Sequence, residues 1–230
     1  MWVKICGIND VKTAEQVAAL APDAIGLNFY SGTPRVVSQD IAADIVRRLP
    51  AGVEPVGVFV NHDVADIIAI CARCRLRTVQ LHGDETPAQV AELQRQSAGL
   101  KIIRVHRLGP DGVAPLAEDL DKCRHLGVQF YACLVDARVE GVYGGSGRTI
   151  AWDAIAERRR GTHWPPLVLA GGLRPDNVAA AIAAVEPWGV DVAGGVESAP
   201  GVKDLSLVSA FIQSARSAND ASAITWADGI

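Results

Sequence analysis

The sequence predicts a (β/α)8 barrel that forms a single domain. Short apolar runs rich in β-branched residues alternate with longer segments of helical periodicity, and this unit recurs eight times within 230 residues. The apolar runs are hydrophobic on both faces, which is typical of parallel strands covered by helices. No linker-like stretch divides the chain. We therefore expect one barrel domain over residues 1–217 and a flexible C-terminal extension over residues 218–230.

The predicted elements follow one another in strict alternation. The strand candidates are residues 3–6, 24–29, 55–60, 78–81, 101–105, 132–135, 167–170 and 190–192. Helical periodicity covers residues 11–20, 39–49, 64–74, 87–96, 113–123, 152–160, 178–185 and 205–215. Thr86-Pro87-Ala88-Gln89 has the pattern of a capping box, and Ser38, Asp63 and Asp204 each precede a helix that they could cap.

An open, doubly wound sheet is the main alternative fold. Such a sheet usually has fewer strands and would need a glycine-rich phosphate loop after its first strand. The turn at that place is Gly7-Ile8-Asn9-Asp10, which lacks the G-x-G-x-x-G pattern. The closed barrel is therefore the favoured prediction.

Composition excludes several classes of partner. A net charge of −4 without a Lys/Arg cluster argues against nucleic-acid binding. No apolar run approaches the length of about 18 residues that a membrane span needs, and the first strand begins too early to leave room for a signal peptide. Five cysteines without a regular framework suit a reducing compartment, so we expect a cytoplasmic protein.

Residues that can carry chemistry follow several of the predicted strands, where barrel enzymes build their sites. Cys6 ends the first strand, next to Lys4 and before a turn, where nearby positive charge would favour its thiolate. An unpaired cysteine more often fills space in a core, so the position alone is weak evidence. The other strand-end candidates are Arg35, Asn61, His82, Asp136, Gly171-Gly172 and Gly194-Gly195. The two glycine turns follow strands seven and eight, the usual phosphate site of this architecture.

Two further patterns favour structural roles. Cys71-Ala72-Arg73-Cys74 has redox or zinc spacing, but no second cysteine pair completes a site, so core packing is favoured. The five histidines are scattered, so we expect no metal centre. For His82 a structural role is favoured over a role in the pocket.

A series of motifs resembles the phosphoribosylanthranilate isomerase family, in order and on nearly every strand from residue 3 to about residue 211. The motifs are Lys4-Ile5-Cys6-Gly7, Gly57-Val58-Phe59-Val60-Asn61, Gln80-Leu81-His82-Gly83, Asp136, Gly144-Gly145-Ser146-Gly147 with Trp152, Ala170-Gly171-Gly172-Leu173 with Pro175 and Asn177-Val178, Val190-Asp191-Val192, and Gly195-Val196-Glu197 with Pro200-Gly201 and Lys203-Asp204.

The resemblance implies an Amadori rearrangement of N-(5-phosphoribosyl)anthranilate to 1-(2-carboxyphenylamino)-1-deoxyribulose 5-phosphate in tryptophan biosynthesis. It implies Asp136 as the acid that opens the furanose, Cys6 as the base that removes the C2 proton, and Arg35 as the partner of the anthranilate carboxylate. Gly171, Gly172, Gly194 and Gly195 would hold the phosphate. The expected partner is a small phosphorylated substrate without cofactor or metal, and the chain is expected to be a monomer or a homodimer.

The sequence departs from the family after the eighth strand. The usual Ser-Ser-Gly-Val-Glu is Ala193-Gly194-Gly195-Val196-Glu197, so two hydroxyl groups are missing and backbone amides would carry the phosphate. Two alternative functions remain open at this point. One is another sugar-phosphate barrel enzyme, which would want a catalytic lysine pair or a metal-binding His/Asp set. The other is a catalytically silent barrel used for binding.

Overall fold

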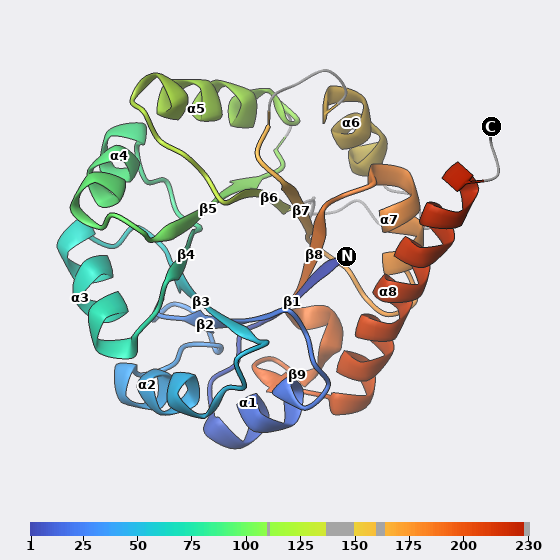
Figure 1. The fold of residues 1–230 in the computed structure, drawn as a ribbon, viewed down its shortest axis with the longest axis horizontal. Coiled ribbons are helices and arrows are strands. Elements are labelled where there is room, and N and C mark those ends of the chain that lie inside the picture. The colour runs from blue at the N-terminus through green and yellow to red at the C-terminus, as the bar shows by residue number, and fades with distance from the viewer. Residues whose placement is uncertain (110, 137–149, 160–163, 228–230) are drawn as a thin grey trace.

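The fold is a closed barrel of eight parallel strands, β1 to β8, joined in sequence order (Figure 1). The computed structural model describes residues 1–109, 111–136, 150–159 and 164–227. The strands are β1 (Trp2–Cys6), β2 (Ala24–Asn28), β3 (Glu54–Phe59), β4 (Thr78–Leu81), β5 (Lys101–Arg107), β6 (Ala132–Asp136), β7 (Leu167–Ala170) and β8 (Gly189–Val192). The ring closes where β1 pairs with β8, with Lys4 in register with Asp191. The predicted fold class is confirmed.

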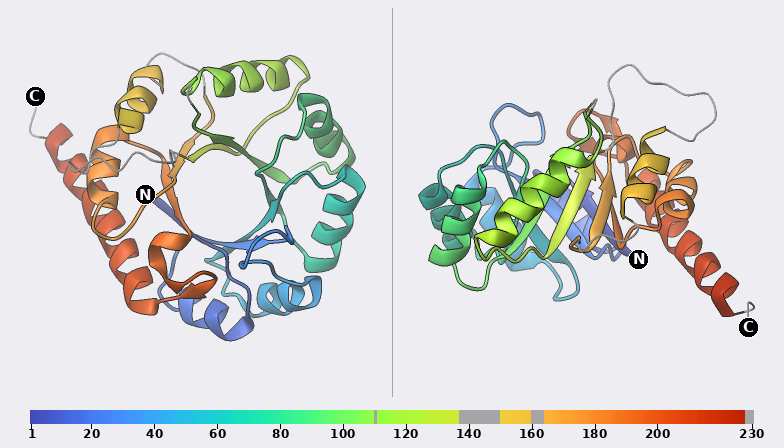
Figure 2. Two further views of the ribbon diagram at one scale, coloured as in Figure 1. Left: turned by 180° about the vertical axis from the view of Figure 1, so that it is seen from behind. Right: turned by 90° about the horizontal axis from the view of Figure 1, so that it is seen from above.

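A helix follows each barrel strand and lies outside the barrel, as Figure 1 and the left view of Figure 2 show. The helices are α1 (Val11–Ala18), α2 (Gln39–Arg48), α3 (Val64–Cys74), α4 (Pro87–Gln96), α5 (Ala114–His125), α6 (Ile150–Arg159), α7 (Val178–Val185) and α8 (Leu205–Ala227). Helix α8 continues well past residue 215, where the sequence pattern predicted its end.

The helix-start signals act largely as predicted. Thr86 and Gln89 form the reciprocal bonds of a capping box at α4. The side chain of Ser38 accepts a hydrogen bond from the Ile41 amide, and Asp204 caps α8 through the amides of residues 206 and 207. The expectation for Asp63 is wrong, because its side chain makes no capping bond although it is the N-cap residue of α3.

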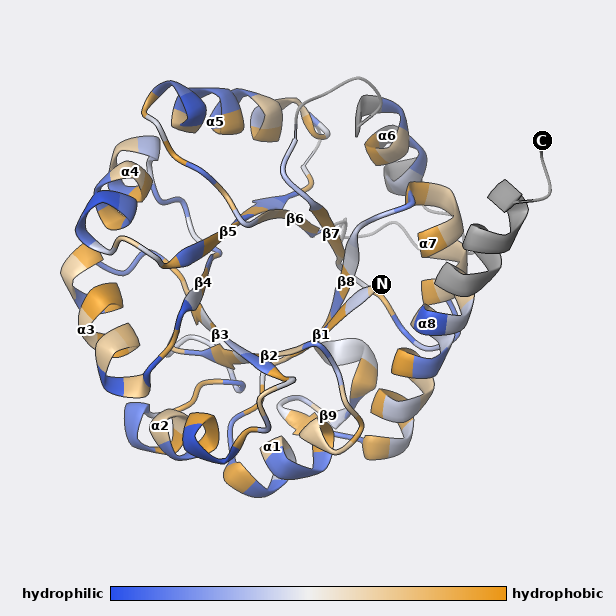
Figure 3. Ribbon diagram, viewed as in Figure 1, coloured by the Kyte–Doolittle hydropathy of each residue, from blue (hydrophilic) through white to orange (hydrophobic). Residues whose placement is uncertain are grey.

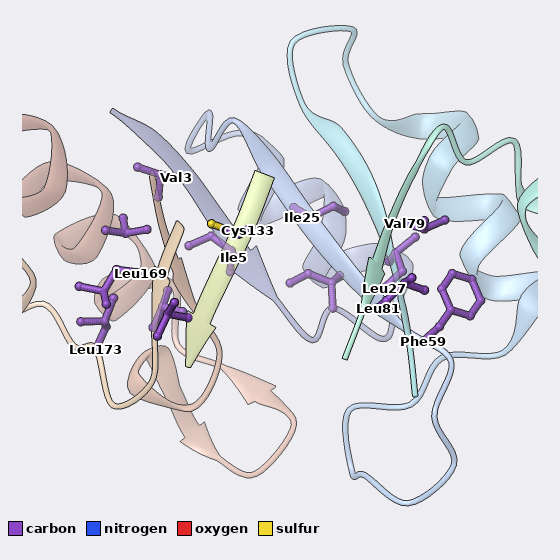
Figure 4. Packing of buried hydrophobic residues seen from close by; sticks show 14 of the residues in the cluster. Val3, Ile5, Ile25, Leu27, Phe59, Val79, Leu81, Cys133, Leu169 and Leu173 are labelled. Atoms are coloured by element: carbon purple, nitrogen blue, oxygen red, sulfur yellow. The ribbon is translucent and has the colours of Figure 1, made fainter. Parts of the chain in front are cut away.

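Two hydrophobic layers enclose the barrel wall. The outer layer lies between strands and helices and includes Val3, Ile5, Ile25 and Leu27, several of which are labelled in Figure 4. Helices α1 to α5 carry hydrophobic residues on part of their surface and hydrophilic residues on the rest, as Figure 3 shows. The inner layer fills the barrel interior with Trp2, Ala24, Val56, Ile103, Val105, Ala132, Leu134, Val168 and Ala170.

Two short strands precede α8 that the sequence pattern did not predict. β9 (Glu197–Ala199) and β10 (Val202–Lys203) form an antiparallel hairpin after a single turn of 3₁₀ helix, η1 (Gly194–Val196). The hairpin approaches the loop after β2, because a Cβ on Gly201 would lie 2.7 Å from the Pro34 carbonyl oxygen. This contact brings residues that follow β8 close to those that follow β2.

Candidate active site

Side chains at the carboxyl ends of the strands point into the barrel by simple alternation. In β1, Val3 and Ile5 belong to the outer layer and Trp2 to the inner one, so Lys4 and Cys6 face inward. The same alternation turns Asp191 of β8 inward, between Val190 and Val192 of the outer layer. Cys6 is the last residue of β1 and is only 8% exposed.

Lys4 lies one inward position deeper in the barrel than Cys6 and is fully buried. Its Nζ donates to Oδ1 of Asp191 at 2.9 Å. The pair raises the pKa of Lys4, because the attraction to Asp191 and to the sulfur of Cys6 outweighs the burial that opposes it. Lys4 is therefore a buried ammonium ion in the interior of the barrel.

Burial raises the pKa of the Cys6 thiol, and the carboxylate of Asp191 acts in the same direction. The positive charges of Lys4 and Lys203 act against this rise. Room for the sulfur comes from Gly26, the residue of β2 in register with Cys6. Sequence reasoning missed Gly26, although a glycine inside a predicted strand often marks a close approach.

Arg35 lies on the same side of the mouth as Cys6 but is already paired. Its Nε and Nη2 donate to the two carboxylate oxygens of Glu197 at 2.8 and 2.7 Å, and Lys203 Nζ donates to Oε1 of Glu197 at 2.7 Å. Burial would raise the pKa of Glu197, but the bonds from Arg35 and Lys203 outweigh it and lower that pKa. Arg35 also passes over Gly7, where a Cβ would lie 2.6 Å from its Cδ and where φ is +84°.

Asp136 ends β6, far around the barrel from β1. It follows Ala132 and Leu134 of the inner layer at the same spacing, so it faces inward and is half-buried. Asp136 interacts electrostatically with His82, which follows β4. The structure thus brings Asp136 to the mouth from the opposite arc to Cys6.

His82 belongs to the mouth as well. Its Nδ1 lies 3.1 Å from Nε2 of Gln80, and Oε1 of the buried Gln80 has no hydrogen-bond partner among the described residues. Burial lowers the pKa of His82, an effect that the carboxylate of Asp136 opposes and the charge of Arg107 reinforces. A neutral imidazole therefore faces the interior near Asp136.

A buried ion network supports the turn that carries His82. Glu85 accepts hydrogen bonds from the backbone amides of Asn61 and Gly83, and Arg104 Nη1 donates to its Oε2 at 3.1 Å. Arg104 also binds Asp119 of α5 through Nε and Nη2. Asn61 thus serves the scaffold of this rim, and the sequence alone did not reveal Arg104 because it faces the helices.

The two predicted glycine turns adjoin each other after β7 and β8. Gly171 and Gly172 have φ values of +90° and +67°. A Cβ on Gly195 would lie 1.8 Å from the carbonyl oxygen of Leu173, so the two turns pack together without space for a side chain. Among the described residues no acceptor binds the amides of Gly172, Gly194 and Gly195. These amides are available to an anion.

One predicted motif lies in a part of the chain that the structure does not describe, and two other expectations concern features that were expected to be absent. The Gly144-Gly145-Ser146-Gly147 motif lies outside the described residues. Within the described ranges, no group of three or more metal-ligating side chains could hold a metal ion. In the same ranges no helix combines the length and the hydropathy that crossing a membrane requires.

Comparison with known proteins agrees with this geometry. The family model described as N-(5'phosphoribosyl)anthranilate (PRA) isomerase matches residues 3–214. The chain belongs to this family. It is 41% identical to the N-(5'-phosphoribosyl)anthranilate isomerase of Geobacter metallireducens over 93% of this chain and 98% of the relative. The predicted family is confirmed.

Solved structures of the family have the same fold. The phosphoribosyl anthranilate isomerase of Thermotoga maritima superposes with a TM-score of 0.78 at 34% identity, covering 94% of this chain and 98% of that one. A phosphoribosyl anthranilate isomerase in complex with reduced 1-(o-carboxyphenylamino)-1-deoxyribulose 5-phosphate superposes with a TM-score of 0.76 at 32% identity, with the same coverage. Another structure presents monomers generated from the dimeric Thermotoga maritima enzyme, with a TM-score of 0.75 at 30% identity and the same coverage again.

The function follows from the family and from near-complete coverage. The chain is a phosphoribosylanthranilate isomerase of tryptophan biosynthesis, an intramolecular oxidoreductase. The activity implied by the sequence motifs is thereby confirmed, rather than that of another sugar-phosphate barrel or of a silent one.

Proposed function

We propose that Asp136 and Cys6 are the acid and the base of this isomerisation. Asp136 protonates the ring oxygen of the furanose while the nitrogen lone pair forms the imine, which opens the ring. The thiolate of Cys6 then removes the proton from C2, and the electron pair moves to give the enolamine. The enolamine then takes up a proton at C1 while its C2 hydroxyl gives up its proton, which yields the ketone. The sequence is an internal shift of hydrogen that needs no external oxidant or reductant.

The observation that carries this assignment is the arrangement of the two strand ends. Cys6 ends β1 and Asp136 ends β6, and both face the interior of a closed barrel in which β7 and β8 lie between them on one side. A substrate that spans the mouth would present its ring oxygen and its C2 proton to groups on opposite sides. Acid and base are therefore separated, so that neither neutralises the other.

Arg35 would bind the anthranilate carboxylate with the edge of its guanidinium group that Glu197 does not occupy. Glu197 occupies the edge formed by Nε and Nη2. The end-on edge, formed by Nη1 and the second hydrogen of Nη2, can still bind a carboxylate with two parallel hydrogen bonds. Glu197 thus orients the guanidinium and leaves its fork for the ligand.

The phosphate would bind to the two glycine turns, Gly171-Gly172 and Gly194-Gly195, through backbone amides that include those of Gly172, Gly194 and Gly195. Their lack of an acceptor among the described residues supports this proposal, as does the close packing of the two turns. The missing hydroxyl groups at positions 193 and 194 would leave these amides as the main donors.

The compartment and the oligomeric state are further parts of the proposal. The partner is a small phosphorylated molecule, and we propose that the enzyme acts on it in the cytoplasm as a monomer or a homodimer. A related enzyme is described as dimeric. Light scattering coupled to size-exclusion chromatography separates the two oligomeric states.

Steady-state turnover of N-(5-phosphoribosyl)anthranilate tests the assignment of the site, together with rescue of a tryptophan auxotroph that lacks this step. The parent gene should rescue growth, whereas genes that encode Cys6→Ser or Asp136→Asn should not. Growth with either variant at comparable protein levels would remove that residue from the mechanism.

A further inference from the structure

An ion pair inside the barrel wall needs an explanation beyond packing. Lys4 is 0% exposed and Asp191 is 7% exposed, whereas the inner layer around them is mostly apolar. Removing two charges from water is unfavourable, and well-packed apolar residues often serve stability as well or better. Such a pair in a barrel interior therefore points to a role in the chemistry.

We propose that Lys4 is a positioning residue that stabilises the thiolate of Cys6, and that Asp191 limits how much of its positive charge acts on the sulfur. The inference rests on the proposed role of Cys6 as the base. An ammonium group has three hydrogens, and one of them is donated to Asp191. The group also interacts electrostatically with the sulfur, and Lys4 and Cys6 occupy adjacent positions on the inward face of β1.

The balance of charge around the sulfur supports this role. Lys4 comes from β1, Lys203 from β10 and Arg35 from the loop after β2, and each interacts with Cys6. The carboxylates of this group are Asp191 of β8, bound to Lys4, and Glu197 of β9, shared by Arg35 and Lys203. The cations therefore exceed the carboxylates by a single charge, which is the charge of one thiolate. Neutralising Lys4 removes this excess.

Lys4 and Asp191 carry opposite charges. Their separate removal should therefore shift the pKa of the Cys6 thiol in opposite directions. In Lys4→Met the thiolate faces Asp191 without compensation and becomes less stable. In Asp191→Asn the ammonium acts on the sulfur without a competing carboxylate, and the thiolate becomes more stable. A pair that merely supported packing would not produce shifts of opposite sign.

The experiment is a pH titration of the thiolate by its ultraviolet absorbance. Each spectrum is corrected with that of the matching protein that also carries Cys6→Ser, so that the four other cysteines cancel. Lys4→Met should raise the midpoint by at least about one pH unit, which leaves about tenfold less thiolate at pH values well below both midpoints. Asp191→Asn should lower the midpoint. The pH profile of kcat/KM should shift in the same direction in each variant.

The double variant Lys4→Met/Asp191→Asn keeps the test decisive if Lys4→Met does not fold, because it leaves no unpaired charge behind. Its midpoint should lie above that of Asp191→Asn alone. Unchanged midpoints, or shifts of the same sign in both single variants, would overturn the inference. The proposed function fails separately, namely if Cys6→Ser retains near-normal turnover whatever the titrations give.

Discussion

Gly26 and Cys6 are register partners in adjacent strands, and a Cβ on Gly26 would lie 2.6 Å from the Sγ of Cys6 and 3.1 Å from its Cα. Real side chains do not approach so closely, so the glycine reserves the space in which the sulfur sits. The reactivity of Cys6 thus depends on a residue in the next strand that carries no functional group.

Gly26→Ala should reduce kcat by about tenfold or more, because the sulfur must move away from its position relative to Lys4 and the substrate. The effect on KM should be smaller. Steady-state kinetics check this prediction. Gly57→Ala is the matched control: its Cβ would press on Phe59 and Leu76 in the outer layer, so it reports packing strain away from the mouth. Equal losses of kcat in both variants would contradict a specific effect on Cys6.

Cys6→Ser should lower turnover by at least about a hundredfold, because a hydroxyl is a far weaker acid than a thiol and supplies almost no anion near neutral pH. The melting temperature should change little, since the two side chains are similar in volume. Cys71→Ser provides the comparison, as it replaces a buried thiol of α3. Its kcat should stay close to that of the parent.

Asp136→Asn should lose most of its catalytic rate while substrate still binds. The amide keeps the size and polarity of the carboxyl group but cannot donate the proton that opens the ring. The measurement is kcat and KM at several pH values. If KM alone increased, Asp136 would be a binding residue and the acid would have to be sought elsewhere.

Glu197 should make the free energy of unfolding decrease as the pH falls into the acidic range. Its pKa in the folded state is lowered, because the bonds from Arg35 and Lys203 outweigh the effect of burial. Its contribution to stability is therefore complete above the ordinary pKa of a glutamate and is lost as the pH falls through the lower, folded-state value. Urea titrations from neutral to acidic pH should show this loss in the parent. In Glu197→Gln stability at neutral pH should be lower and this part of the acid dependence should disappear.

The proposed phosphate site at the two glycine turns can be tested with inorganic phosphate as a competitive inhibitor. Gly172→Ala introduces a Cβ into open space but at a φ of +67°, which strains the turn by about 1 kcal/mol. Its inhibition constant should therefore rise. Gly194→Ser restores a hydroxyl where the nearest atom to the new Cβ is Arg35 Nη2 at 3.4 Å, and should improve affinity by up to about 1 kcal/mol.

Gly195 is a poor probe of the same site. A Cβ there would lie 1.8 Å from the Leu173 carbonyl oxygen, so that substitution disrupts the contact between the two turns and the fold around it. If neither Gly172→Ala nor Gly194→Ser changes the inhibition constant, the phosphate binds elsewhere on the mouth.

Local sequence patterns predicted most of the fold. Strand cores, helix spans and the capping box at Thr86 and Gln89 depend on neighbouring residues, and these elements were predicted within a few positions. The length of α8 was underestimated because hydrophobic periodicity fades in its second half. The hairpin of β9 and β10 was missed because strands of two and three residues carry too little pattern.

By itself the sequence determined the barrel, its family and the candidates at the strand ends, because alternation of apolar runs and short motifs are properties of contiguous residues. Tertiary structure alone decided how these candidates pair. Lys4 meets Asp191 across 187 positions and Arg35 meets Glu197 across 162, because the first strand closes the ring against the last. Whether Lys4 faced inward or outward depended on the same closure. Partners so far apart in the chain share no local signal, so only the geometry of the closed barrel reveals which charges act on the sulfur of Cys6.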